Sequence, residues 1–201
     1  MEINTLLEGR EISTWFYYQP YYQRIAKMVQ EPDNFRKFME LGTYKGNSIC
    51  YLADKISEYG ELDEVEICTI DTFNPTSTSS NTWKREKDLK EMCFNNIEKL
   101  GMSDVVNVLV GSAHDYAKDC EDDYFDFVFI DADHKYESVK QDIDDWYPKV
   151  RKGGILAGHD YAQSQHGIRK AVDDRFGNKV ETFQTIPQLK KCAVWEVVKW
   201  E

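Results

Sequence analysis

Two short runs of acidic and imidazole side chains are the first candidates for chemistry. Asp131, Asp133 and His134 directly follow one apolar stretch, and His159 and Asp160 follow the next. If both stretches are parallel strands, their carboxyl ends meet at one edge of a sheet, so these side chains converge there. Carboxylate oxygens suit Mg²⁺ or Mn²⁺. Such an ion would hold substrate hydroxyls and lower their pKa.

A turn that contains two glycines is the second candidate. Gly42 and Gly46 lie within Glu40-Leu-Gly-Thr-Tyr-Lys-Gly-Asn-Ser48, where a predicted strand becomes a helix. Glycine permits positive φ and a close backbone approach, and the N–H groups of a helix start attract anions. The spacing is not Gly-x-Gly-x-x-Gly, which disfavours a dinucleotide. An ordinary tight turn remains the alternative.

Two further strand ends carry residues that suit a nucleoside. Asp71 ends the next predicted strand and can accept both hydroxyls of a ribose, with a helix-cap or loop aspartate as the alternative. Gly111-Ser112-Ala113 follows the third strand, where an adenine ring would lie. Ser112 is equally typical of an N-cap, because Asp115 stands three residues later.

These residues require a frame of alternating strands and helices. Apolar runs predict strands at 37–41, 65–70, 105–110, 125–130 and 154–157, and a closing pair at 180–183 and 192–198. Amphipathic patterns predict helices at 47–59, 83–100, 112–119, 136–150 and 167–176. The alternation predicts an α/β fold, namely a Rossmann-like, doubly wound, mostly parallel seven-stranded sheet with an antiparallel C-terminal edge strand.

Two segments lie outside this regular pattern. A helix rich in Trp and Tyr is predicted over 14–29, and its aromatic stripe is typical of core or dimer contacts, with a cap over the substrate as the other interpretation. We therefore expect an N-terminal helical extension, 1–34, and one α/β domain, 35–201. The polar segment 73–82 is interpreted as a mobile flap.

The composition limits which binding partners and which cellular compartment we expect for this protein. The 201 residues include 25 Lys and Arg against 36 Asp and Glu, a net charge of −11 that disfavours binding to nucleic acid. No apolar run approaches the ~20 residues that span a bilayer. The five cysteines show no Cys-x-x-Cys spacing, and no signal-peptide pattern is visible, so we expect a cytoplasmic protein. The sequence is compatible with a homo-oligomer.

The ordered motifs resemble those of class I S-adenosylmethionine-dependent methyltransferases. The resemblance rests first on three successive strand ends: Glu40-x-Gly42-x-x-x-Gly46, Asp71 and Gly111-Ser112. The later block is similar to the branch that contains macrocin-type and related sugar O-methyltransferases: Phe-Ile-Asp131-Ala-Asp133-His134-x-Tyr136-Glu137, Asp142, Pro148, Gly153-Gly154 and His159-Asp160-Tyr161. Most of the chain, from residue 36 to residue 200, takes part.

The resemblance implies a transferase that uses S-adenosyl-L-methionine for O-methylation of a small-molecule or sugar (glycan) hydroxyl, with or without Mg²⁺ or Mn²⁺. It implies the following cofactor contacts: Glu40, Gly42, Tyr44, Gly46, Ser48, Asp71, Thr72, Gly111, Ser112, Ala113 and Asp131. In that branch a metal is bound by the aspartate after strand four and by an acidic pair after strand five. The matching residues are Asp131 and Asp160, with His159 in place of one acidic residue. The histidine three residues after the first aspartate is the general base there, which makes His134 and Asp131 the catalytic candidates.

Other interpretations stay open at this stage. His134 could cap the following helix, His159 could be a turn histidine, and Asp131 could bind only the amino group of the cofactor. His166 could approach a substrate, whereas His114 is expected on a helix surface. For the whole protein, the alternatives are a non-catalytic S-adenosylmethionine-binding module and methyl transfer to a non-hydroxyl acceptor. The glycine spacing disfavours a nicotinamide-dependent oxidoreductase.

Overall fold

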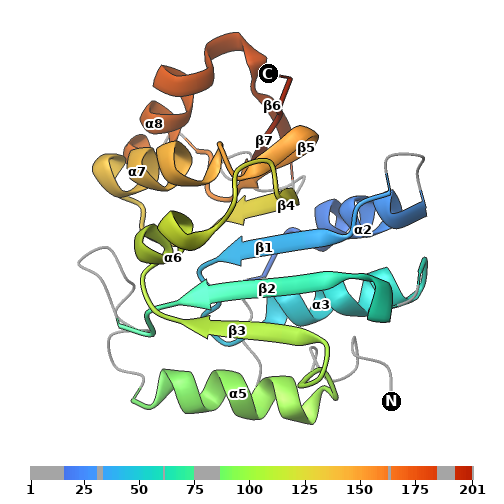
Figure 1. The fold of residues 1–201 in the computed structure, drawn as a ribbon. Coiled ribbons are helices and arrows are strands. Elements are labelled where there is room, and N and C mark those ends of the chain that lie inside the picture. Colours follow the sequence, from blue (N-terminus) through green and yellow to red (C-terminus); the bar gives the residue numbers. More distant parts are fainter. Residues whose placement is uncertain are drawn as a thin grey trace.

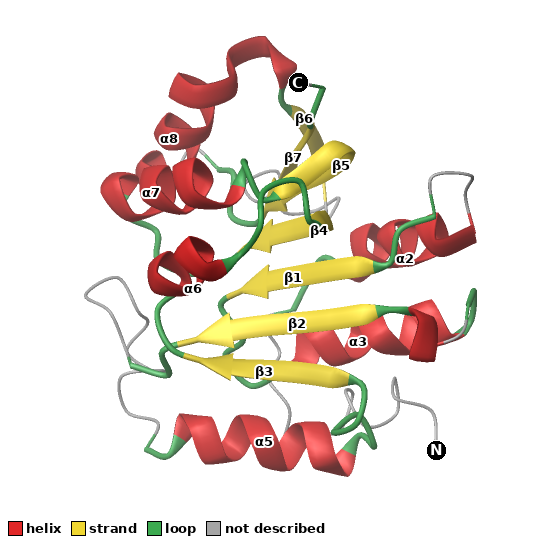
Figure 2. Cartoon of the chain, in the orientation of Figure 1, coloured by secondary structure: helices red, strands yellow, loops and turns green. Residues whose placement is uncertain are grey.

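Seven strands form one sheet that is covered by helices on both faces (Figures 1 and 2). The computed structural model describes residues 16–30, 34–60, 62–74, 87–162, 164–184 and 193–200. The start of the predicted aromatic helix, most of the predicted flap over 73–82, and Cys192 therefore lie outside the described residues.

The strand order confirms the predicted fold class. Along the sheet the order is β3-β2-β1-β4-β5-β7-β6. The bounds are β1 Lys37–Leu41, β2 Glu66–Asp71, β3 Val106–Val110, β4 Phe125–Ile130, β5 Val150–Gly158, β6 Glu181–Gln184 and β7 Ala193–Val198. Strands β1 to β5 pair in parallel, whereas β7 is antiparallel to both β5 and β6. The antiparallel β7 thus lies one strand in from the edge, which β6 occupies.

The chain reverses its winding direction between β1 and β4. β1 pairs with β2 on one side and with β4 on the other, and all three strands end at the same edge (Figure 1). In open α/β sheets a crevice forms beyond the carboxyl ends of the strands at such a switch point. The residues that follow β1, β2 and β4 are therefore brought to one place.

Helices cover the two faces in two groups. Their bounds are α2 Gln19–Lys27, α3 Asn47–Ser57, α5 Leu89–Lys99, α6 Ala113–Asp119, α7 Tyr136–Trp146 and α8 His166–Phe176, with 3₁₀ turns at Met28–Gln30, Leu62–Glu64 and Gly177–Lys179. Apolar side chains of α2, α3 and α5 share one core, and those of α6, α7 and α8 share the other. Successive side chains of β4 point to opposite faces of the sheet and so contribute to both cores. Phe127 and Phe129 face the first core, and Val128 and Ile130 face the second.

Helix boundaries differ from the sequence prediction at three places. The aromatic helix begins at Gln19 rather than at residue 14, because Pro20 stands in its first turn and its ring would collide with a preceding helical carbonyl. The helix predicted to reach residue 150 ends at Trp146, since Pro148 lacks the N–H that would continue it. The helix predicted from residue 83 begins at Leu89, after Asp88 adopts φ 62°.

The described part of the N-terminal extension belongs to the core. Tyr21, Tyr22 and Ile25 are buried in the first core, and the ring centroid of Tyr22 lies 5.0 Å from that of Phe129 in β4. This agrees with the core interpretation of the aromatic stripe. Within the described residues, every helix is too short or too polar to cross a bilayer.

Candidate functional site

The turn after β1 is locked against the chain that leaves β4. Gly42 has φ +96°, and a Cβ added there would lie 2.1 Å from the backbone oxygen of Asp131. The glycine is therefore required by protein backbone, and not only by the close approach of a ligand. The backbone N–H of Gly42 donates to the carbonyl of Ile70 (2.8 Å), which ties the same turn to β2.

The second glycine of the turn starts the following helix. Gly46 is the N-cap of α3 with φ +81°, a conformation that side chains with a Cβ rarely adopt. A Cβ there would also lie 3.0 Å from the side chain of Ile97 in α5. α3 thus begins at a glycine directly after the turn, and a helix start is a place that suits an anionic or polar ligand.

Asp71 holds this turn in place. Its carboxylate accepts hydrogen bonds from the backbone N–H groups of Tyr44 (2.8 Å) and Phe73 (2.7 Å). Burial raises the pKa of Asp71, although these backbone donors act in the opposite direction. The loop-aspartate interpretation is thus confirmed. Ribose binding stays a prediction, because each carboxylate oxygen can accept a second hydrogen bond.

The third strand end forms a helix cap. Ser112 is the N-cap of α6, and its hydroxyl accepts from the backbone N–H of Asp115 at 3.4 Å. The N-cap interpretation is confirmed, while adenine contacts by Gly111, Ser112 and Ala113 stay predictions. Thr72, the predicted contact after β2, is exposed, and its hydroxyl accepts from the N–H of Asn74 (3.2 Å).

Glu40 is buried beneath the turn. Its two carboxylate oxygens accept hydrogen bonds from the hydroxyls of Tyr22 in α2 (2.5 Å) and Ser48 in α3 (2.8 Å). Desolvation raises the pKa of Glu40 to about 8, against the effect of both hydroxyl donors. Two predicted cofactor contacts, Glu40 and Ser48, therefore belong to one internal network that also ties down the N-terminal helix.

Four chemically capable side chains converge where β4 and β5 end. Asp131, His134 and Asp160 each place one ligand atom within 4.8 Å of the others. The imidazole Nε2 of His134 lies 3.3 Å from Oδ2 of Asp160. The Nδ1 of His159 lies 3.5 Å from Oδ1 of Asp160 and 3.9 Å from Oδ1 of Asp131. The predicted metal set named His159, whereas the set whose ligand atoms all lie within 4.8 Å contains His134.

The environment of this cluster favours cationic groups. Burial raises the pKa of Asp131, and the negative charge of Asp160 acts in the same direction. His159 and His134 oppose this shift when they are charged. A carboxylate that is desolvated in this way gains most from a cation that offsets its charge.

The loop that carries His134 is fixed by its neighbours rather than by the imidazole. Asp133 accepts hydrogen bonds from the backbone N–H of His134 (2.9 Å) and from the hydroxyl of Ser138 in α7 (2.8 Å). Lys135 is the N-cap of α7, so the helix-cap interpretation of His134 is wrong. The start of α8 presses on the same loop, because a Cβ on Gly167 would lie 2.3 Å from the backbone oxygen of His134.

Tyr18 joins this cluster, although no sequence pattern indicated it as a site residue. Its hydroxyl donates to Oδ2 of Asp131 (3.0 Å), and its ring centroid lies 4.7 Å from that of His159. The only sequence signal was the aromatic stripe near the N-terminus, which gives no indication of a partner 113 residues away.

The two remaining histidines are not in the set of grouped ligand atoms. His166 is exposed at the start of α8. The Nδ1 of His114 lies 2.7 Å from a carboxylate oxygen of Asp145, and its side chain is 41% exposed, as expected for a helix surface.

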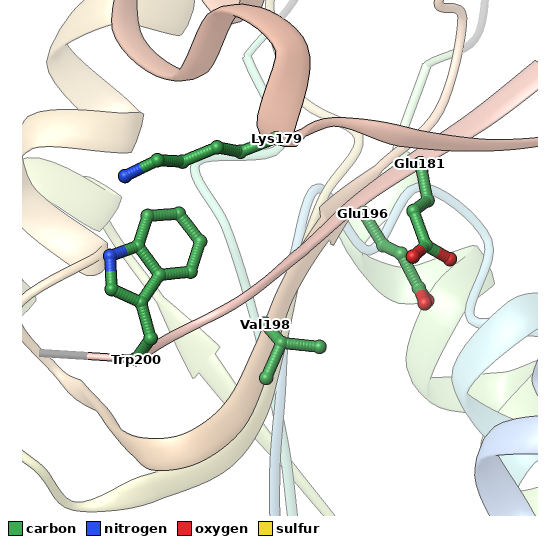
Figure 3. A pocket seen from close by; sticks show the side chains of 5 residues that line it. All are labelled: Lys179, Glu181, Glu196, Val198 and Trp200. Atoms are coloured by element: carbon green, nitrogen blue, oxygen red, sulfur yellow. The ribbon is translucent and has the colours of Figure 1, made fainter.

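A separate cavity of about 420 Å³ lies beside β6 and β7 (Figure 3). It is lined by Lys179, Glu181, Glu196, Val198 and Trp200. None of these is a predicted site residue. The carboxylate of Glu196 already accepts a hydrogen bond from Tyr21 (2.6 Å) and pairs with Arg24, which indicates a structural role for it.

Two comparisons with known proteins find methyltransferases. A family model described as a methyltransferase domain matches residues 39–161. The fold resembles an O-methyltransferase from Bacillus cereus in complex with SAH (TM-score 0.68, 19% identity, 98% of this chain and 89% of that chain). It also resembles the O-methyltransferase TomG from Streptomyces achromogenes in complex with SAM (TM-score 0.65, 15% identity, 98% of this chain and 87% of that chain).

One curated relative is much longer than this chain. An uncharacterized protein of Sinorhizobium fredii, y4gI, is 24% identical over 156 residues. The match covers 78% of this chain but only 16% of that relative.

The contact between the turn and the β4 exit predicts the effect of substituting Gly42. Gly42→Ala should lower the free energy of unfolding by at least ~3 kcal/mol, because the new Cβ meets backbone that cannot rotate away. Gly101→Ala is the matched control, since Gly101 also has positive φ (+70°) but no atom within 4 Å of its added Cβ. That control should cost only about 1 kcal/mol. Equal losses in urea unfolding would show that the contact carries no strain.

The buried Glu40 predicts a pH dependence of stability. Its pKa rises from 4.5 to about 8 on folding, so between these values the folded state binds the proton more tightly than the unfolded chain does. Stability should therefore fall as pH rises from 4.5 toward 8. Urea unfolding across this range should show a flatter profile for Glu40→Gln than for the parent protein. An exposed control, Glu98→Gln, should keep the parent's slope, and an unchanged slope in Glu40→Gln would contradict the assignment.

Proposed function

This chain belongs to the methyltransferase-domain family, within the class I S-adenosylmethionine-dependent methyltransferases, and we propose that it transfers a methyl group from S-adenosylmethionine to a hydroxyl of a small molecule or sugar. The observation that carries the proposal is the His134–Asp160 pair beside Asp131 at the switch point of the sheet. A histidine paired with a carboxylate is the commonest kind of group that removes a proton from a hydroxyl.

The cofactor fits the chemistry of the residues that surround the turn. S-adenosylmethionine supplies a methyl group on a positively charged sulfur, and its methionine part carries an ammonium. The desolvated carboxylate of Asp131 lies at this edge of the sheet and favours positive charge nearby. The start of α3 and the carboxylate of Asp71 supply polar groups for the rest of the molecule.

His134 is assigned the role of general base. Asp160 lies 3.3 Å from Nε2, so an Nε2–H that donates to Asp160 leaves the lone pair on Nδ1. Nδ1 could then accept the proton of the acceptor hydroxyl, whose oxygen would take the methyl group and leave S-adenosylhomocysteine. Asp160 holds the ring in that tautomer and stabilises the imidazolium that forms, which is the usual arrangement of a base with an orienting carboxylate.

A divalent ion is the second candidate for activating the hydroxyl. Asp131, His134 and Asp160 offer oxygen, nitrogen and oxygen atoms within 4.8 Å of one another. Two ligands of one small ion are separated by at most about 4 Å, so the set is close to a metal-binding geometry. Mn²⁺ and Mg²⁺ suit these donors. In that case His134 would be a ligand, and the metal would lower the pKa of the acceptor.

The acceptor class rests on the resemblance to the sugar O-methyltransferase branch, and the net charge of −11 favours acceptors other than nucleic acid. The test is an assay of S-adenosylhomocysteine formation with sugar, phenol, peptide and RNA pools. We expect product with the sugar or phenol pools. Product with only the peptide or RNA pool would overturn the proposed acceptor, and product with none would favour a non-catalytic binding module.

The same assay separates the two ways of activating the hydroxyl. Run in excess chelator and again with added Mn²⁺ or Mg²⁺, it should show whether turnover depends on a metal. If His134 is the base, turnover should persist in chelator and should depend on the His134 side chain. Loss of turnover in chelator, restored by Mn²⁺, would instead make Asp131, His134 and Asp160 the ligands.

Substitution of His134 tests its role as general base. His134→Ala should lower kcat by ~10²–10⁴-fold with little change in affinity for S-adenosylhomocysteine, because a positioned base contributes about that factor. His114→Ala is the control, since that imidazole pairs with Asp145 away from the cluster. A loss below ~5-fold, with the pH profile retained, would contradict the role of general base.

A further inference from the structure

Tyr18 reaches the cluster from the residue that precedes α2. Its side chain is buried, with 3% of the residue exposed. The hydroxyl donates to Oδ2 of Asp131 at 3.0 Å. The ring lies between Phe129 and His159, with centroid distances of 4.9 Å and 4.7 Å. Because Tyr18 is also the N-cap of α2, its backbone is fixed by the start of that helix.

The hydrogen bond gives the two carboxylate oxygens of Asp131 different surroundings. Oδ2 is held by the phenol, whereas Oδ1 faces Nδ1 of His159 at 3.9 Å. A buried carboxylate without such a donor is free to rotate about its last side-chain bond, and its oxygens then have no fixed direction. With Oδ2 held, Oδ1 is the atom presented toward the cluster.

Two other tyrosines of the same helix make comparable bonds but serve different places. Tyr22 donates to Glu40 (2.5 Å), and Tyr21 donates to Glu196 (2.6 Å). Glu196 belongs to β7 and lies outside the cluster. Tyr21 and Tyr18 therefore form a matched pair, since both are buried phenols that donate to a carboxylate of the sheet, but only Tyr18 touches a site residue.

We propose that Tyr18 is a positioning residue that directs Oδ1 of Asp131 toward a cationic ligand, which is either a divalent ion or the ammonium of the cofactor. The inference rests on the proposed function in one respect, namely that Asp131 faces the reaction site. Donors that orient a ligating carboxylate are commonly worth ~10–100-fold in metal affinity.

The test compares Tyr18→Phe, which keeps the ring and removes the hydroxyl, with Tyr21→Phe. Mn²⁺ affinity is measured by electron paramagnetic resonance, and S-adenosylhomocysteine affinity by calorimetry. Tyr18→Phe should weaken at least one of the two by about tenfold or more, while Tyr21→Phe should leave both within ~2-fold. Weaker Mn²⁺ binding identifies the ion as the ligand, and weaker S-adenosylhomocysteine binding identifies the ammonium. Unchanged affinities in Tyr18→Phe would overturn the proposal.

Thermal unfolding of both variants separates positioning from stability. Each loses one buried hydrogen bond to a carboxylate, so their midpoints should fall by similar amounts. If Tyr18→Phe does not fold, 3-fluorotyrosine placed at position 18 alone replaces it. Bound Mn²⁺ or S-adenosylhomocysteine should then broaden or shift the fluorine signal of that residue, and no change with either ligand overturns the proposal. All these readouts measure binding, so a failure of methyl transfer would be seen separately in the turnover assay.

Discussion

Among the described glycines, Gly42 has the least room for a side chain, because the turn after β1 passes against the chain that leaves β4. Gly42 passes so near the backbone oxygen of Asp131 that no other residue fits without moving one of the two segments. This contact joins the turn that starts α3 to the loop that carries His134. The turn before α3 and the loop that carries His134 therefore meet in one backbone contact at the switch point of the sheet.

Buried carboxylates are the second feature on which the structure depends. Glu40 and Glu196 are buried and Asp131 is partly buried, and each accepts a hydrogen bond from a tyrosine of the N-terminal segment. A buried charge without a partner would be strongly unfavourable. The aromatic segment therefore does more than fill the first core, because its hydroxyls hold three acidic side chains that the sheet itself cannot satisfy.

The two histidines of the cluster differ in their surroundings. His159 is buried with its ring against Tyr18, whereas His134 is more exposed and lies beside Asp160. Exposure on the crevice side favours the group that meets substrate, and burial favours a group that orients its neighbours. This difference supports His134 as the residue that handles the proton, with His159 as part of the frame around Asp131.

The sequence by itself determined the order of strands and helices, because apolar alternation and glycine stops are local patterns. It also placed Asp131, His134, His159 and Asp160 at strand ends, and parallel strands that end at one edge must bring such residues together. Only the tertiary structure decided which atoms meet. Side-chain direction brought His134 into the set of grouped ligand atoms, and Tyr18 reached Asp131 across 113 residues. No local pattern encodes such a contact, since it depends on how a helix docks on a sheet that forms from later parts of the chain.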